Sequence, residues 1–416
     1  MVSRIANPLT PPSIKRLSDS LPPDARRLLR SAIEAATTAG IELWAVGGPV
    51  RDAALGRQLV DIDLAARDGV PTLAASLAAR FRVDPNIEAR FGTASLTVEG
   101  RRLDLATLRT ERYRRPGALP TVTVHATLEA DLARRDFTVN ALALGLSGPA
   151  RGRFVDPVRG LDDLTHRRLR VLHSRSFQDD ATRLWRAARL TASHGLRPDP
   201  ATLALIEEGA SALGLISGDR LWAELCLVAA RGRAARTLAT LDRWGALRGT
   251  HTAFRLTPEA RRALAHRPRP LPAARLVAVL LGPLDPAAAN SILDRFNAPP
   301  EARHAVAGAH RLIHAAHTLP DPADFERLEH TSEDARTAAA WLAPETAPLL
   351  RALRRWERTR PHLAARELMR LGVPEGPEIG RLLRCLRRGR YVGTLASATA
   401  ARAHVRNAIE ESRPSR

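Results

Sequence analysis

The fold is decided by residues 41–63, which read IELWAVGGPVRDAALGRQLVDID. The stretch opens with a short apolar run, Ile41 to Val46, whose alternation is typical of a β-strand, and the glycine pair Gly47 and Gly48 ends that strand in a turn. Glycine lets backbone N–H groups approach a phosphate closely, and a helix starting at Pro49 directs its positive end toward the same anion. The segment therefore predicts a strand, a glycine turn and a helix that together receive phosphate.

Two carboxylates, Asp61 and Asp63, close the same stretch. Alternate residues of a strand point to one face, so these side chains lie together and repel unless a cation, usually a divalent metal, sits between them. Asp104, on an expected neighbouring strand, is placed to be the third acid of a two-metal site for in-line displacement at phosphorus. The alternative is that Asp61 and Asp63 only solvate an exposed strand end. The glycine turn upstream favours the metal site.

Short strands and helices surround this stretch in the first 150 residues. Helices are expected over about 24–40 and 71–82, and further strands over 61–65, 94–98, 102–105 and 141–146. From about residue 178 onward, apolar residues recur at helical spacing, with Pro- and Gly-containing breaks between the segments. The predicted fold class is therefore α+β, with a small mixed sheet and helices in the N-terminal part and an all-α remainder.

Composition narrows the class of protein further. The chain has 416 residues with 44% hydrophobic side chains, which is enough for a core, and only two cysteines, too few for a disulfide framework. It has no apolar run of the roughly 18 residues that a membrane span needs, so we expect a cytoplasmic protein with no membrane contact. The 64 Lys and Arg residues exceed the 44 acidic ones, for a net charge of +20. Such an excess of cations points to a polyanionic partner, nucleic acid first.

A second polar cluster lies at residues 131–142, DLARRDFTVNAL. The adjacent arginines Arg134 and Arg135 can grip phosphates through paired N–H groups, and Asn140 can hydrogen-bond a ribose hydroxyl. The same Arg-Arg-Asp run is equally compatible with a surface ion pair.

A third cluster contains Asp180 and Arg183, which a helix would place side by side at positions i and i+3. Carboxylate acceptors and guanidinium donors together match the Watson–Crick edge of cytosine or adenine, where an exocyclic amino group adjoins a ring-nitrogen acceptor. Uracil and guanine present the reverse pattern. The pair can therefore select C and A without a template, although an ordinary ion pair on a helix is the alternative.

Taken in order, these segments resemble the class II tRNA nucleotidyltransferases, the family of CCA-adding enzymes and bacterial poly(A) polymerases. The glycine turn through Asp63 looks like the family's metal-binding motif, residues 104–113 like its third-carboxylate strand and mobile loop, and 134–140 like its ribose motif. Residues 156–164 are similar to its hinge, 179–183 to its nucleotide-selecting motif and 220–224 to its supporting neck motif. Asp179 stands where the selecting motif usually has Glu, which leaves Asp180 and Arg183 intact.

The resemblance implies a nucleotidyltransferase head over residues 21–160, after a loose lead-in over 1–20, and a helical neck over 161–250, body over 251–345 and tail over 346–416. It implies CTP and ATP as substrates, two Mg²⁺ ions at Asp61 and Asp63, with Asp104 as the third catalytic acid. The nucleotide-binding residues it implies are Gly47, Gly48, Arg51, Arg134, Asp136, Asn140, Asp180, Arg183 and Arg186. The acceptor and TΨC arms of tRNA would contact Arg381, Arg384, Arg387 and Arg388 in the tail.

Other activities share the same motifs. Enzymes that add only CC or only A, and poly(A) polymerases, carry the same head, and the resemblance implies that the partial enzymes differ mainly in the loop that is residues 107–131 here. That loop shows no large deletion, which favours full CCA addition. An RNA-binding protein with a relic head is the non-enzymatic alternative. The presence of Asp61, Asp63 and Asp104 argues against it.

Overall fold

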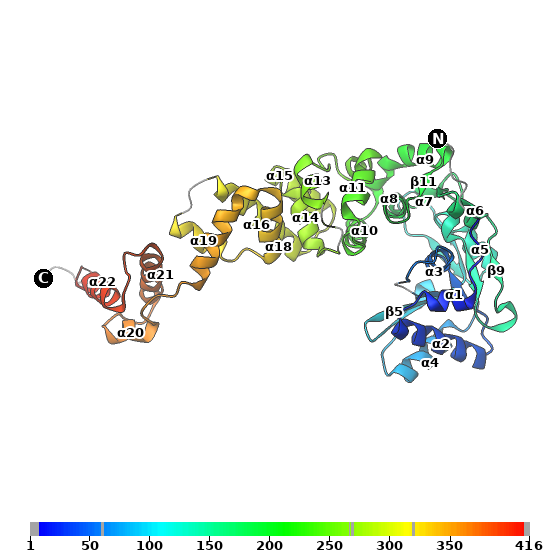
Figure 1. Cartoon of the computed structure of the whole chain (residues 1–416), viewed down its shortest axis with the longest axis horizontal. Helices are drawn as coiled ribbons and strands as arrows, with labels where there is room; N and C mark the ends of the chain where they lie inside the picture. The colour runs from blue at the N-terminus through cyan, green and yellow to red at the C-terminus, as the bar shows by residue number, and fades with distance from the viewer. Residues whose placement is uncertain (1–7, 60–61, 266, 268–269, 318–320, 412–416) are drawn as a thin grey trace. The chain divides into compact units, whose positions relative to one another are not determined.

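The structure, a computed structural model, describes residues 8–59, 62–265, 267, 270–317 and 321–411. It forms two compact units: residues up to Glu224 with Arg236–Arg255, and Leu225–Ala235 with Leu256–Arg416. The first unit holds the strands and the second is helical (Figure 1). The fold class is thus α+β, as the sequence predicts. No helix in the described ranges is long and apolar enough to cross a membrane. The boundaries of head, neck, body and tail stay predictions.

A seven-stranded mixed sheet organises the first unit. Its strand order is β3-β4-β5-β2-β1-β8-β9. The strands are β1 (Leu43–Val46), β2 (Ile62–Ala66), β3 (Asn86–Glu88), β4 (Thr93–Val98), β5 (Arg101–Thr107), β8 (Ala143–Gly145) and β9 (Phe154–Val155). The central strand β2 pairs antiparallel with β1 and parallel with β5. The strands and the helix expected at 94–98, 102–105 and 71–82 are all present.

Alternation along β1 explains why the sheet has a core on each face. Leu43 packs into one hydrophobic cluster, while Trp44 packs into another on the opposite face. The first cluster takes leucines from α2 (Pro23–Thr38) and α4 (Val70–Phe81), and the second takes Leu128 and Leu132 from α5 (Leu128–Ala133). Period-two alternation of apolar residues therefore buries both faces of this strand.

Two segments differ from the sequence-based expectation. Residues expected to be a loose lead-in contain α1 (Ile14–Asp19), which begins where the Ser13 side chain accepts a hydrogen bond from the Arg16 backbone N–H, and whose Leu17 is buried. The expected loop over 107–131 contains a hairpin of β6 (Arg109–Arg112) and β7 (Thr121–Val124), followed by α5. Both segments contain few apolar residues at helical or strand spacing, so the sequence gives only a weak signal for these elements.

Helices make up the rest of the first unit. They are α3 (Gly48–Ala54), α6 (Gly160–Thr165), α7 (Ser176–Asp179), α8 (Thr182–His194), α9 (Pro200–Gly209), α10 (Gly218–Ala230), which continues into the second unit, α11 (Ala234–Arg243) and α12 (Ala246–Thr250). Two short strands, β10 (Arg168–Leu169) and β11 (Arg197–Pro198), pair in parallel.

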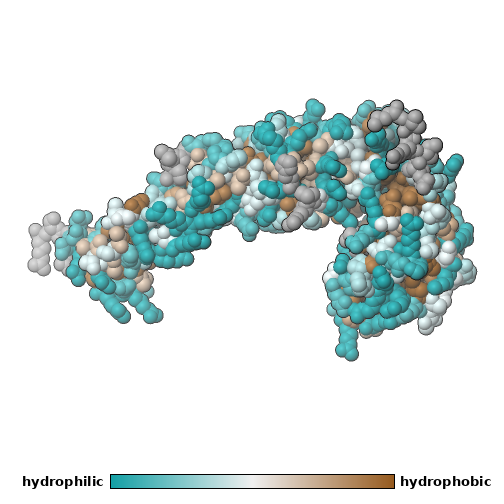
Figure 2. All heavy atoms as spheres, viewed as in Figure 1, coloured by the Kyte–Doolittle hydropathy of each residue, from teal (hydrophilic) through white to brown (hydrophobic). Residues whose placement is uncertain are grey.

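The second unit is built from helices, and its described part includes two hydrophobic clusters. Its helices are α13 (Pro258–Ala265), α14 (Ala273–Leu281), α15 (Pro286–Arg295), α16 (Pro300–Ala316), α17 (Pro322–Leu328), α18 (Glu333–Leu342), α19 (Ala347–Arg358), α20 (Ala365–Arg370), α21 (Pro377–Val392) and α22 (Ala398–Glu411). One cluster centres on Trp356, stacked on Phe325, and the other on Leu386 and Val405. Hydrophilic side chains cover most of the visible surface (Figure 2).

Candidate active site

The glycine turn after β1 brings an arginine close to the backbone. Gly47 has φ +72° and ψ −122°, a backbone conformation that is strained for any residue with a Cβ atom. A Cβ atom there would lie 2.7 Å from Nη1 of Arg135. Glycine is therefore required by the backbone conformation, and an added Cβ would also force the flexible end of the Arg135 side chain to move. The family resemblance implies Arg134 as a nucleotide-binding residue, but the arginine that the structure brings to the turn is its neighbour, Arg135.

The carboxylates of the expected metal site lie on adjacent strands. Asp63 of β2 is the register partner of Asp104 in β5, and since the strands are parallel, both side chains point to the same face. Nε of Arg102 donates to both oxygens of Asp104, at 2.9 and 3.0 Å. Asp61 lies outside the described residues, and within the described ones no group of three His, Cys, Asp or Glu side chains is placed to hold a metal ion. Asp63 and Asp104 supply the hard oxygen donors that Mg²⁺ prefers, so the pair fits that ion.

Arg51 and Asn140 connect the turn to the second cluster. Arg51, only 8% exposed, donates from Nη1 to Oδ1 of Asn140 at 2.5 Å, and Nδ2 of Asn140 donates to Oδ1 of Asp136 at 2.9 Å. Burial acts to raise the pKa of Asp136, but Arg186 and the Asn140 amide outweigh burial and hold that pKa below its usual value. Asp136 is therefore a carboxylate at neutral pH, and three residues predicted from two separate motifs form one hydrogen-bonded chain.

The Arg134 guanidinium is held by acids of the protein itself. It contacts Glu111 at 2.6 Å and Asp131 at 2.6 Å, and its Nε donates to the Arg109 carbonyl. Asp131 also pairs with Arg135 at 2.9 Å. Arg134 thus ties the start of the β6–β7 hairpin to α5, and its contact with a nucleotide stays a prediction. Sequence reasoning missed Glu111 and Asp131, although both stand inside quoted motifs.

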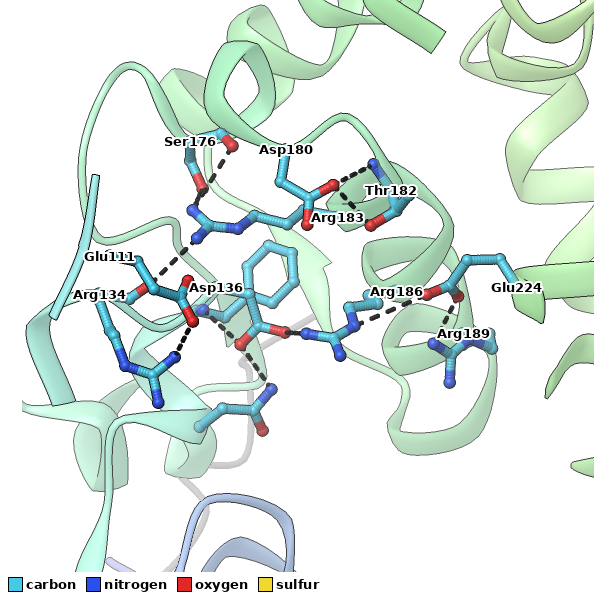
Figure 3. A network of polar contacts seen from close by, with 12 residues as sticks. Glu111, Arg134, Asp136, Ser176, Asp180, Thr182, Arg183, Arg186, Arg189 and Glu224 are labelled. Atoms are coloured by element: carbon cyan, nitrogen blue, oxygen red, sulfur yellow. Dashed lines mark hydrogen bonds and ion pairs between the residues drawn. The ribbon is translucent and has the colours of Figure 1, made fainter. Parts of the chain in front are cut away.

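The predicted base-reading pair is brought together, but not on one helix. Asp180 is extended (φ −143°) in the break between α7 and α8, where its Oδ1 accepts from the Thr182 backbone N–H at 3.0 Å. Arg220 also donates to that oxygen at 2.6 Å. Arg183, 4% exposed, donates to Ser176 Oγ at 2.8 Å. The helical i, i+3 placement is therefore wrong, because Asp180 lies before α8, which begins at Thr182 and carries only Arg183 of the pair. Their side chains still lie beside one another (Figure 3).

Helix α8 extends the polar network to α10. Arg186 lies 3.3 Å from Asp136 and 3.7 Å from Glu224, and Arg189 pairs with the same glutamate at 2.7 Å (Figure 3). Burial acts to lower the pKa of Arg186, but Asp136 and Glu224 outweigh burial and raise it. Glu224, from the supporting motif of the sequence analysis, thus fixes an arginine that reaches the ribose-motif aspartate.

This geometry agrees with comparisons against known proteins. Residues 43–170 match the family described as the poly A polymerase head domain. The chain is 37% identical over 372 residues to the CC-adding tRNA nucleotidyltransferase of Deinococcus radiodurans, a match that covers 88% of this chain and 89% of the relative. The chain belongs to the tRNA nucleotidyltransferase family. It is an enzyme of the nucleotidyltransferase class, with nucleotides as substrates.

Other tRNA nucleotidyltransferases resemble this chain over part of its sequence or in its fold. The A-adding tRNA nucleotidyltransferase of Halalkalibacterium halodurans is 36% identical over 220 residues, which cover 52% of this chain and 51% of the relative. The structure of the Thermotoga maritima CCA-adding enzyme complexed with tRNA CCA superposes with a TM-score of 0.69 at 22% identity, over 98% of this chain and 100% of the other. This structural likeness shows the shared fold.

The second unit of the nucleotidyltransferase carries a pocket rich in arginine. A cavity of about 520 Å³ is lined by Arg351, Arg354, Arg355, Arg358, Thr359, Arg390 and Tyr391, with no acidic residue among them. By contrast, three of the predicted RNA-binding residues already pair with acids: Arg381 with Glu378, Arg387 with Glu329 and Arg388 with Glu326. Arg384 is exposed, and none of the ion pairs found among described residues includes it. A cluster of positive charge without acidic residues in its lining therefore lies on α19 and the end of α21.

Proposed function

We propose that this chain adds cytidine and adenosine from CTP and ATP to the 3′ end of tRNA, building CCA without a template. The observation that carries the proposal is the continuous polar network from Arg51 through Asn140 and Asp136 to Arg186. It joins the glycine turn, the ribose motif and α8, the helix that carries Arg183, within one compact unit. We also propose a cytoplasmic location, where CCA-ended tRNA is used in translation.

The reaction is in-line attack of the tRNA 3′-hydroxyl on the α-phosphate, with pyrophosphate as the leaving group. Arg51 and Arg135, beside the glycine turn, would bind and orient the triphosphate through charged hydrogen bonds. Asn140 and Asp136 would bind the ribose hydroxyls. These residues lower the barrier by holding the two reacting groups in line.

Two Mg²⁺ ions would be held by Asp63 and Asp104, with Asp61 as the further ligand proposed from the sequence. When bound, they would lower the pKa of the 3′-hydroxyl and neutralise charge on the phosphates. Asp63→Asn should then remove activity and leave tRNA binding unchanged. Asp68→Asn, an exposed acid in the loop after β2, is the matched control. Full activity of Asp63→Asn would contradict the metal assignment.

Base selection would depend on Asp180 and Arg183. The carboxylate accepts from the exocyclic amino group of C or A, and the guanidinium donates to the adjacent ring nitrogen. Arg220 already orients Asp180, and Ser176 orients Arg183. Asp180→Ala should therefore relax the preference for CTP and ATP over UTP and GTP more than it lowers total incorporation.

The tRNA acceptor and TΨC arms would bind the second unit by their phosphates. The arginine pocket at the end of α19 offers cations without acidic partners in its lining, whereas Arg381, Arg387 and Arg388 are partly neutralised. We therefore expect Arg351 and Arg354 to contact tRNA directly. Recognition by phosphates depends on shape and weakens steeply with salt.

The test uses tRNA transcripts that end at the discriminator base, at C and at CC. Each is incubated with Mg²⁺ and with CTP, ATP or both, and the 3′ ends are sequenced. Extension of all three transcripts to CCA and no further is the expected result. Long A tails on any RNA would identify a poly(A) polymerase. No extension by the wild-type chain would leave only RNA binding with a relic head.

CC addition is the second candidate, because the Deinococcus radiodurans relative named CC-adding matches along 89% of its length. The same assay separates the two. A stop at CC in the presence of ATP would establish the CC-adding activity. Extension of only the CC transcript, by A, would instead establish A addition.

A further inference from the structure

The C-terminal end of α8 contacts the helix that follows the glycine turn. Nε2 of His194 lies 2.9 Å from Oδ1 of Asp52 in α3, and Nδ1 lies 2.8 Å from Oγ of Ser193. The His194 side chain is only 9% exposed. Neither His194 nor Asp52 has a part in the reaction as described above, yet their contact joins two segments that are 142 residues apart.

Asp52 in turn holds the Arg51 guanidinium along one edge. Its Oδ1 accepts from Nε of Arg51 at 2.8 Å and its Oδ2 accepts from Nη2 at 3.0 Å. The remaining terminal nitrogen, Nη1, donates to Asn140. Every nitrogen of this guanidinium therefore has an acceptor, and its plane is fixed by Asp52 on one side and Asn140 on the other.

Arg51 and Asp52 need an anchor outside their own helix. Successive residues of a helix project in different directions and do not face each other, so their side chains meet only where something holds them. His194 supplies that contact from α8. The same helix carries Arg186, which reaches Asp136 at the other end of the Arg51–Asn140–Asp136 chain.

The charges around the histidine define how the contact works. Burial would raise the pKa of Asp52, but His194 and Arg51 outweigh burial and lower it to about 2, so the group is ionised and only accepts hydrogen bonds. Burial lowers the pKa of His194; Arg51 and Arg57 act in the same direction, and Asp52 opposes them. Since Nε2 is the ring nitrogen that faces this carboxylate, and the carboxylate can only accept, Nε2–H of His194 donates to Asp52.

We propose that His194 is a positioning residue for the incoming nucleoside triphosphate: through Asp52 it sets the orientation in which Arg51 meets the phosphates. The inference rests on the proposed function, since that function gives Arg51 its part in nucleotide binding. Removing the His194 N–H leaves the Asp52 side chain held by Arg51 alone, and the Arg51 guanidinium can then rotate away from the phosphates. The KM for CTP then rises, while the KM for tRNA does not.

The decisive variants are His194→Leu, which keeps the bulk and removes the donor, and His194→Gln, whose amide N–H replaces Nε2–H. Loss of one hydrogen bond to a charged group predicts a rise of roughly ten- to thirtyfold in the KM for CTP with His194→Leu. Glutamine should restore most of it. His166→Leu removes an exposed histidine paired with Asp162 and is the matched control. The assays vary CTP at saturating tRNA and tRNA at saturating CTP.

A double variant tests the route through Asp52. Asp52→Asn combined with His194→Leu should be no worse than Asp52→Asn alone, because both changes break one chain. An unchanged KM for CTP in His194→Leu would overturn the proposal. So would equal losses for leucine and glutamine, or additive effects in the double variant. Should the leucine variant not fold, His194→Gln and Asp52→Asn still decide between these outcomes.

Failure of the proposed function gives a different pattern. Arg51→Gln with an unchanged KM for CTP would remove Arg51 from nucleotide binding, and the proposed site would fail with it. A raised KM in Arg51→Gln beside an unchanged KM in His194→Leu would overturn only the inference about His194.

Discussion

Asp131→Asn is the sharpest test of the architecture around the glycine turn. The carboxylate is 2% exposed and pairs with Arg134 at 2.6 Å and Arg135 at 2.9 Å, and its Oδ1 accepts from the backbone N–H of Arg109 at 3.2 Å. Burial acts to raise the pKa of Asp131, but the two guanidinium groups outweigh burial and keep it below its ordinary value. The native partner of both arginines at neutral pH is therefore a charged group.

The size of the effect follows from what the substitution leaves behind. Asparagine keeps the shape and one acceptor but presents an N–H to a guanidinium that also only donates. Removing one partner of a buried ion pair costs about 3–5 kcal/mol. The side chains of Arg134 and Arg135 are 16% and 19% exposed, and Arg134 keeps Glu111. We therefore expect the lower end, a loss of about 3 kcal/mol, or roughly a hundredfold in the local opening equilibrium.

Hydrogen exchange measured by mass spectrometry reports local opening of individual segments. It is preferable to global unfolding, because a chain of two compact units need not unfold in a single two-state transition. Peptides covering α5 and β6 should lose protection, while peptides from α21 in the second unit should not. The control is Glu129→Gln, which removes an exposed charge from the same first turn of α5. Equal protection in the Asp131 and Glu129 variants would refute the assignment of Asp131 as the anchor of both arginines.

Three further predictions concern other parts of the molecule. Gly47→Ala should destabilise the first unit by about 2–3 kcal/mol in thermal unfolding and raise the KM for CTP, because the backbone strain adds to the approach of Arg135. Asp52, whose pKa falls from 3.8 to about 2, should contribute about 2 kcal/mol above pH 4, lost as the pH falls toward 2, and Asp52→Asn should flatten that acid transition. Arg351→Ala and Arg354→Ala should each reduce the slope of log K for tRNA against log salt by about 1.

Matched variants make these three predictions decisive. Gly40 also has a positive φ, +68°, but nothing lies within 4 Å of its added Cβ, so Gly40→Ala should lower stability without changing the KM for CTP. Arg303 is already paired with Asp294, and Arg303→Ala should leave the salt slope unchanged. Equal stability and equal KM for CTP in Gly47→Ala and Gly40→Ala would refute the role of Arg135 at the turn. An unchanged acid transition in Asp52→Asn would refute the contribution of the Asp52 carboxylate. A wild-type salt slope in Arg351→Ala and Arg354→Ala would show that these arginines do not contact tRNA phosphates.

Much of the site was readable from local pattern. Gly47 follows a strand and precedes a proline-led helix, and Asp63 and Asp104 each sit in a strand that apolar neighbours reveal. Such features depend on residues close in sequence, where backbone geometry sets the direction of side chains. The glycine, the carboxylates and the mixed α+β class followed from that geometry alone.

The partners of charged residues were beyond the sequence. The Arg-Arg pair at 134 and 135 gives no sign of which guanidinium approaches the turn. Asp131, three and four residues before them, pairs with both arginines, and it is Glu111 on β6 that takes Arg134. A helical spacing likewise misplaced Asp180, since that residue is extended in the break between α7 and α8, and α8 begins only at Thr182.

The sequence by itself determined the family, the strand–turn–helix around Gly47 and the types of residue around it, because these depend on spacing and on backbone conformation. Only the tertiary structure decided which charges are already neutralised within the protein. It paired Arg387 and Arg388 with the distant glutamates Glu329 and Glu326, gathered other arginines in an acid-free pocket at α19, and set His194 against Asp52. The physical reason is that ion pairs and hydrogen bonds form over a few ångströms of space, whatever the distance along the chain.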